Sequence, residues 1–256
     1  MPVTIAGMLF PGLDLRYISR QFDATAPAVV EASRHSGSAA QDADHSPSML
    51  QQAMLRLLEL LQIIETDMGE DNKLARQDFD LNELGDYAIQ MLSDLADAAN
   101  SLKLEQQSQQ LEDLTLPLAV WIVRHGGEVR SLAPIVNALA RLANTLSEPD
   151  LLAQLYHLIR ELQLTVDTSG RQDAGRSASS RPWRLLLMNQ AIIATRSHQP
   201  DLIDEAYQLL MEALPEEAPR FFAEGMQQME LINYPQVVKQ VVKKYYNLWG
   251  LPRTLH

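Results

Sequence analysis

The chain has 256 residues, of which 46% are hydrophobic and 21% charged, an ordinary composition for a soluble globular protein. It has no cysteine, which excludes disulfides, thiolate zinc sites, iron–sulfur clusters and cysteine nucleophiles. This acidic chain has a net charge of −12, which repels phosphates and so disfavours general binding to nucleic acids and anionic lipids. Only 6% of residues are aromatic, while leucine, alanine and glutamine are frequent, and this mixture favours helices over strands.

The sequence also bears on the compartment. No segment approaches about 18 continuous apolar residues, so we expect no membrane span. The first residues, MPVTIAGMLFPGLDL, have no basic region, and Pro11 and Gly12 interrupt their apolar run, which is unlike a secretory signal. We therefore expect the protein to be cytoplasmic.

Residues 1–48 are predicted to be a poorly ordered N-terminal arm and linker. Glu31–Ser48 is small and polar and has no periodic apolar face to bury. The first 30 residues leave two alternatives open, a disordered leader or an arm that docks on the body or on a partner. The apolar side chains that would dock are Leu9, Phe10, Leu13, Leu15, Tyr17, Ile18 and Phe22.

Residues 49–256 are predicted to form one all-α domain, because apolar residues recur there at spacings of three and four. The first helix ends near Met68-Gly69, the second fits residues 82–102, and the third runs over residues 105–125. Pro117 is expected to kink or split the third helix, because proline lacks the N–H and clashes with the preceding turn.

Prolines mark the first turns of the later helices, where a missing N–H costs nothing. They are Pro134, Pro149, Pro182, Pro200, Pro215 or Pro219, and Pro235. The links between these helices are short, except for residues 167–181, which we predict to be a mobile surface loop. We expect about nine helices and no strand.

An internal repeat is the most specific signal in the chain. The segment PDLLAQLYHLIREL from Pro149 aligns with PDLIDEAYQLLMEA from Pro200, and proline, aspartate, two leucines, tyrosine and glutamate are identical. A third copy begins near Pro235, where apolar residues follow the same register. Without the long loop, the period is about 36 residues, which is typical of helix-pair repeats.

A helical pair of this period resembles the tetratricopeptide family over about residues 130–251. Ala206 and Ala213 are seven residues apart, as in the second helix of that motif, and Phe221, Gly225 and Tyr234 fall at its aromatic, glycine and tyrosine positions. The resemblance implies stacked antiparallel helix hairpins, an α-solenoid that binds other proteins. HEAT-like pairs fit nearly as well, and an irregular helical bundle is the other alternative.

Arg124-His125-Gly126 resembles the Arg-His-Gly motif of histidine phosphatases, in which the histidine is the phosphorylated nucleophile. In that family the motif follows a strand, whereas here it follows a predicted helix. We instead expect a helix C-terminus, with basic residues near the last carbonyls and glycines able to take positive φ.

Two other groups resemble metal sites. Asp78, Asp80 and Asn82 have the spacing of the first ligands of a calcium loop, but the rest of the loop pattern fails, so we expect a turn with Asp80 or Asn82 as a helix cap. His157 and Glu161 are four residues apart on one helix but lack further ligands. We therefore expect no metal, no cofactor and no catalytic site, and a protein that is not an enzyme.

The last predicted helix, Pro235–Trp249, combines a wide apolar stripe with lysines on the remaining arc. It belongs to a stretch, residues 231–256, that has four basic residues and no acidic one. One interpretation is a capping helix with its lysines in solvent. The other is a partner-binding surface, because tyrosine and tryptophan are frequent anchors and lysines attract acidic partners. The candidate residues are Lys239, Lys243, Lys244, Tyr245, Tyr246 and Trp249.

These observations predict a protein–protein interaction module, such as an adaptor, scaffold or chaperone-like protein, that binds a peptide or helix of another protein. A helical enzyme or small-molecule binder with a pocket between helices is the first alternative. A regulator that contacts nucleic acid through the basic C-terminal helix is the second. Homodimerisation through an apolar face stays open.

Overall fold

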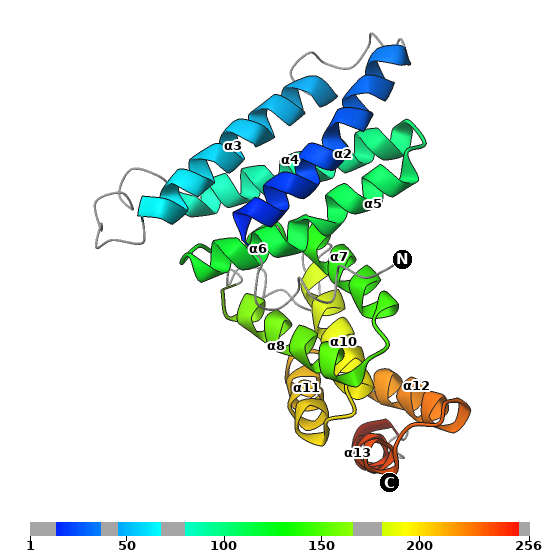
Figure 1. The fold of residues 1–256 in the computed structure, drawn as a ribbon. Helices are drawn as coiled ribbons and strands as arrows, with labels where there is room; N and C mark the ends of the chain where they lie inside the picture. The colour runs from blue at the N-terminus through cyan, green and yellow to red at the C-terminus, as the bar shows by residue number, and fades with distance from the viewer. Residues whose placement is uncertain (1–13, 37–45, 68–79, 166–180, 251–256) are drawn as a thin grey trace. The chain divides into compact units, whose positions relative to one another are not determined.

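The computed structural model describes residues 14–36, 46–67, 80–165 and 181–250, and within these ranges the chain is helical and has no strand (Figure 1). The all-α prediction is therefore confirmed. No helix in the described ranges is both long and apolar enough to cross a membrane. The loop predicted at 167–181 lies outside the described residues, except for Arg181.

The chain divides into two compact units. Unit 1 comprises Met1–Leu139 and Glu161–Asp167, and unit 2 comprises Ala140–Arg160 and Thr168–His256. The division falls within two helices, α7 (Leu132–Thr145) and α8 (Pro149–Thr165), inside the region predicted to be one domain.

Unit 1 contains five helices among its described residues, in addition to its parts of α7 and α8. They are α2 (Leu15–His35), α3 (Pro47–Asp67), α4 (Leu81–Ser101), α5 (Glu105–Asp113) and α6 (Thr115–Arg124). Helix α4 packs against α3, α5 and α6, while α2 packs against α3 and α5 (Figure 1).

Helix α2 differs from the poorly ordered arm predicted for residues 1–48. The Asp14 side chain caps it by accepting the N–H of Tyr17 at 2.9 Å. Leu15, Ile18 and Phe22 are all fully buried. Their spacing of three and four residues places them on one face of the helix, and that face docks on the rest of unit 1. Of the two alternatives for the arm, docking therefore applies to this segment.

The third predicted helix is split, as Pro117 indicated. Helix α5 ends at Asp113 and α6 begins at Thr115, so the proline lies in the first turn of α6, where its missing N–H is tolerated.

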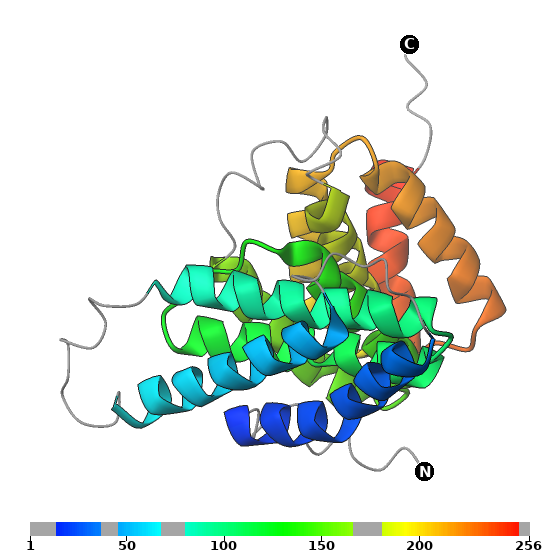
Figure 2. The ribbon, with the colours of Figure 1, turned by 90° about the horizontal axis from the view of Figure 1, so that it is seen from above.

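Unit 2 ends with two helix pairs. Helices α10 (Arg181–Arg196) and α11 (Pro200–Ala213) pack on each other, as do α12 (Ala218–Leu231) and α13 (Gln236–Tyr245) (Figures 1 and 2). A π-helical turn, η4 (Tyr246–Gly250), continues α13 and packs against both helices of its pair. The predicted prolines lie at or near the starts of these helices, Pro200 and Pro219 in the first turn and Pro235 at the N-cap.

Side-chain contacts connect the turns of successive helix pairs in unit 2. Arg196, at the end of α10, donates hydrogen bonds to the carbonyl oxygens of Ala143 and Leu146, at the end of α7. His198, in the next turn, packs edge-on against Tyr234, with 5.6 Å between ring centroids. Tyr234 lies in the turn between α12 and α13, so three turns are connected in sequence.

Candidate functional site

Tyr245, one of the predicted anchor residues, is a core residue of unit 2. Its side chain is 2% exposed, and its ring packs against Tyr207 and Phe222 with centroid distances of 5.1 and 5.5 Å. Its hydroxyl donates a hydrogen bond to Oδ1 of Asp204 at 2.7 Å. Tyr245 therefore attaches α13 to α11 and offers no surface to a partner. Sequence alone could not separate these roles, because an aromatic residue on an amphipathic helix suits both.

Lys244 is engaged by the same carboxylate. Its Nζ donates to Oδ1 of Asp204 at 2.6 Å, and Gln208 Nε2 donates to Oδ2 at 2.8 Å. The hydrogen bonds from Lys244 and Tyr245 hold the pKa of Asp204 below its usual value. The charge of Lys244 is therefore compensated within unit 2.

Three of the predicted residues remain on the outer side of the last helix. Lys239, Lys243 and Tyr246 are spaced four and three residues apart, which places them on one face. Lys243 is exposed and the other two are half-buried. No carboxylate in the described part of the chain pairs with either lysine. We call these three residues the C-terminal face. Trp249, the last predicted residue, is half-buried.

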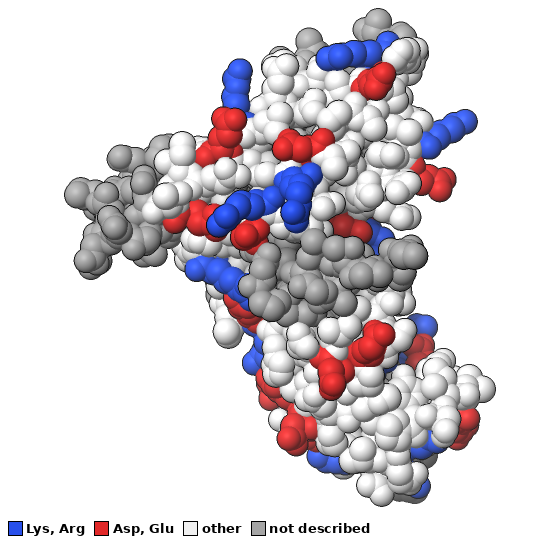
Figure 3. Space-filling model, viewed as in Figure 1, with Lys and Arg blue, Asp and Glu red and all other residues white. Residues whose placement is uncertain are grey.

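Exposed apolar side chains also occur in α12 and η4, and of these only Leu248 belongs to the apolar stripe expected for the last helix. Leu231 is 78% exposed at the end of α12, and Leu248 is 58% exposed in η4. The surface over α12 is mostly uncharged (Figure 3). Helical periodicity could not predict that Leu231 and Leu248 are exposed, because it does not show which apolar residues of a terminal helix pack against another helix.

The Arg124-His125-Gly126 motif forms a helix end, as predicted. His125 is the C-cap residue of α6, and Gly126 has φ 86°, which glycine adopts without strain. The imidazole stacks on Trp121 at a centroid distance of 4.0 Å, and its Nδ1 lies 2.7 Å from the Trp121 carbonyl oxygen. These contacts give the motif a structural role.

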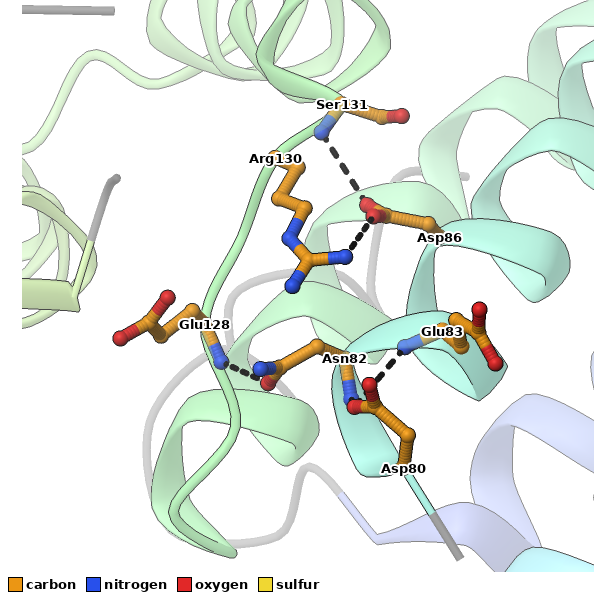
Figure 4. Close-up of polar contacts among 7 residues, drawn as sticks. All are labelled: Asp80, Asn82, Glu83, Asp86, Glu128, Arg130 and Ser131. Atoms are coloured by element: carbon orange, nitrogen blue, oxygen red, sulfur yellow. Dashed lines mark hydrogen bonds and ion pairs between the residues drawn. The ribbon is translucent and has the colours of Figure 1, made fainter. Parts of the chain in front are cut away.

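The group that resembles a calcium loop instead begins α4 (Figure 4). Oδ1 of Asp80 accepts the N–H groups of Asn82 and Glu83 at 2.9 and 3.3 Å, so Asp80 is the helix cap, as predicted. Oδ1 of Asn82 accepts the N–H of Glu128 at 2.7 Å, which attaches the segment after α6 to α4. Asp78 lies outside the described residues.

A second attachment lies one turn further along α4 (Figure 4). Asp86 accepts the N–H of Ser131 at 3.2 Å and lies 4.0 Å from the guanidinium of Arg130. The side-chain oxygens of Asp80, Asn82 and Asp86 therefore accept hydrogen bonds from backbone N–H groups, and Asp86 also pairs with Arg130. These contacts give the three side chains a structural role.

His157 and Glu161 have separate contacts. Glu161 accepts two hydrogen bonds from Arg124, at 2.9 and 3.2 Å. The His157 ring packs edge-on against Tyr156, with 5.7 Å between centroids. Within the described ranges, no three histidine or acidic side chains are grouped so that they could hold a metal ion.

Tyr156 is a buried residue of unit 2 whose hydroxyl has an unusual environment. Its side chain is fully buried, and within the described residues its hydroxyl makes no hydrogen bond of good geometry, although the side chains of Glu205 and Gln190 lie close enough to influence it. Burial, together with the carboxylate of Glu205, raises its pKa well above the usual value. Tyr207, its equivalent in the internal repeat, instead shares a hydrogen bond of 2.8 Å with the Thr195 hydroxyl.

Compared with models of protein families, with curated proteins and with solved structures, the chain matches none of them. The choice between candidate sites therefore depends on the contacts of its own residues, and these favour the C-terminal face.

Proposed function

We propose that the protein binds other proteins and that the C-terminal face receives an acidic segment of the partner. The observation that carries this proposal is the row of Lys239, Lys243 and Tyr246, whose two lysines have no carboxylate partner in the described part of the chain. Uncompensated lysines beside an aromatic side chain attract acidic segments and give them an apolar contact.

A protein partner is favoured over a nucleic acid. The net charge of −12 opposes the approach of a phosphate backbone. Because Asp204 compensates Lys244, only two of the three lysines of α13 are left for a partner. Exposed Leu248, in the adjoining turn, adds an apolar contact that suits a protein segment.

An arrangement of stacked hairpins in unit 2 is part of this proposal. The contacts of Arg196 with the end of α7, and of His198 with Tyr234, support it, because they connect successive turns as stacking requires. The tetratricopeptide-like repeat and the cytoplasmic location stay predictions.

A displayed library of random 16-residue peptides, selected on the full-length protein, tests the proposal. We expect enrichment of peptides rich in Asp and Glu, and at least tenfold weaker binding of these peptides to the K239E/K243E variant. The matched control is R34E/R56E, which reverses two exposed arginines on α2 and α3 of unit 1. The control should bind the selected peptides like the wild type.

Two results would overturn the proposal. One is that no enriched peptide depends on Lys239 and Lys243. The other is that a labelled DNA duplex binds at about 0.15 M salt and loses affinity in the same variant, which would assign the face to nucleic acid.

A further inference from the structure

Helix α10 is surrounded by other helices of unit 2 on most of its circumference. The Thr195 hydroxyl bonds to Tyr207 on α11, and Arg184 forms an ion pair with Glu217 at the N-cap of α12. Arg196 contacts the end of α7. Accordingly, Trp183, Leu186, Leu187, Gln190, Ala191, Ile193 and Ala194 are all buried.

The remaining side of α10 is apolar and open. Leu185 is 40% exposed and Ile192 is 44% exposed, and half-buried Met188 lies between them. Spacings of three and four residues align these side chains in one stripe. A single exposed apolar residue is ordinary, but two exposed ones joined by a half-buried methionine in one stripe on an otherwise enclosed helix mark a surface that another chain can cover.

The sequence between α8 and α10 is made up mostly of small and polar residues. Residues 166–180 contain no leucine, isoleucine, methionine or aromatic residue. This stretch of sequence therefore has no leucine-like or aromatic side chain to offer the stripe.

Arginines stand at both ends of the stripe. Arg181 lies four residues before Leu185, and Arg196 lies four residues after Ile192. Neither has a carboxylate partner in the described ranges, because Arg196 donates to neutral carbonyl groups. At 1.5 Å per residue, the two arginines are about 22 Å apart along the helix, the length of a helix of about 15 residues.

We propose that this face, which we call the α10 stripe, binds an amphipathic helix of a partner protein that has an apolar centre and acidic ends. Leucine-like side chains of that helix, at spacings of three and four, contact Leu185, Met188 and Ile192. Its terminal carboxylates pair with Arg181 and Arg196. This inference rests on the proposed function, because it requires a protein partner, but it concerns a different face.

The test uses the same peptide library, now selected on the full-length K239E/K243E variant, so that the C-terminal face no longer contributes. We expect enriched peptides with apolar residues at helical spacing and Asp or Glu at one or both ends. Fluorescence anisotropy then measures each peptide against L185S/I192S and against R181E. We expect at least tenfold weaker binding to the first variant and about fivefold weaker binding to the second.

The matched control is I63S on α3, which removes an apolar residue that is 58% exposed and lies outside the stripe. It should leave affinity unchanged. The side chains substituted at positions 63, 181, 185, 192 and 243 are exposed and that at position 239 is half-buried, so thermal melts will confirm that the variants are folded.

Three outcomes would overturn the inference: no enriched peptide, equal binding to wild type and L185S/I192S, or enriched peptides with no acidic preference. Sedimentation that shows a dimer lost in L185S/I192S would assign the stripe to a second copy of the chain instead. Acidic peptides that depend on Lys239 and Lys243 but not on the stripe would uphold the proposed function and refute this inference alone.

Discussion

The Tyr245 hydroxyl donates a hydrogen bond to the Asp204 carboxylate at 2.7 Å and thereby attaches the last helix to α11. The side chain at position 204 therefore decides how firmly α13 is held. We predict that D204A lowers the free energy of unfolding by about 1–2 kcal/mol, since it removes charge-assisted hydrogen bonds and leaves the buried Tyr245 hydroxyl only the longer contact, 3.3 Å, with the carbonyl oxygen of residue 204. Urea unfolding at pH 7 measures this change.

The same carboxylate predicts a pH dependence. Because the pKa of Asp204 is lower in the folded than in the unfolded state, its contribution is complete above the unfolded pKa, about 3.9. That contribution is lost as the pH falls through the lower, folded pKa. D204N should therefore lose less stability than the wild type on acidification below pH 4. The control E212Q, at an exposed position of the same helix, should keep the wild-type slope.

We predict different results for the same substitution at Tyr156 and Tyr207, the equivalent tyrosines of the internal repeat. Y207F removes a buried hydroxyl that bonds to Thr195, and should cost about 1 kcal/mol. Y156F removes a buried hydroxyl that makes no hydrogen bond of good geometry within the described residues, and should cost less than Y207F or nothing. Chemical unfolding of the two variants side by side makes the comparison, and equal losses would contradict it.

The hydrogen bonds of Arg196 lead us to predict that its substitution also lowers the free energy of unfolding. R196A leaves the carbonyl groups at the end of α7 without their donor, and should cost about 1–3 kcal/mol. R196K should recover only part of this loss, because an ammonium group lacks the planar fork that reaches two acceptors. The measurement is the free energy of unfolding, with R56A on the exposed side of α3 as the control. Similar values for R196A and R56A would refute the role of Arg196.

Docking of α2 on unit 1 predicts a large effect from a substitution in the N-terminal arm. Phe22 is fully buried, so F22A should cost about 3–5 kcal/mol. R16A changes a neighbouring residue whose side chain is 88% exposed, and should alter stability by less than about 0.5 kcal/mol. A loss at Phe22 as small as that at Arg16 would show that α2 contributes nothing to the core.

Much of the local structure could be predicted from the sequence. Apolar spacing and proline positions located most helices after residue 46, and the split near Pro117 and the cap at Asp80 followed from proline and aspartate chemistry alone. The helix end at His125-Gly126 likewise needed only the positive φ that glycine allows. Helix α2 was not predicted, because the polar stretch after residue 30 favoured a poorly ordered arm, although Leu15, Ile18 and Phe22 were among the apolar side chains expected to dock if the arm did.

The candidate site depended on tertiary contacts instead. Tyr245 and Tyr246 are adjacent aromatic residues, yet only the first is a core residue, because Asp204 and the ring of Phe222 meet it there. On α10, Leu186 is likewise buried, whereas its neighbour Leu185 is exposed. Helix formation depends on residues within a turn or two of each other, so the sequence alone determined it. Burial and charge compensation depend on which distant helix arrives beside a side chain, so only the tertiary structure decided them.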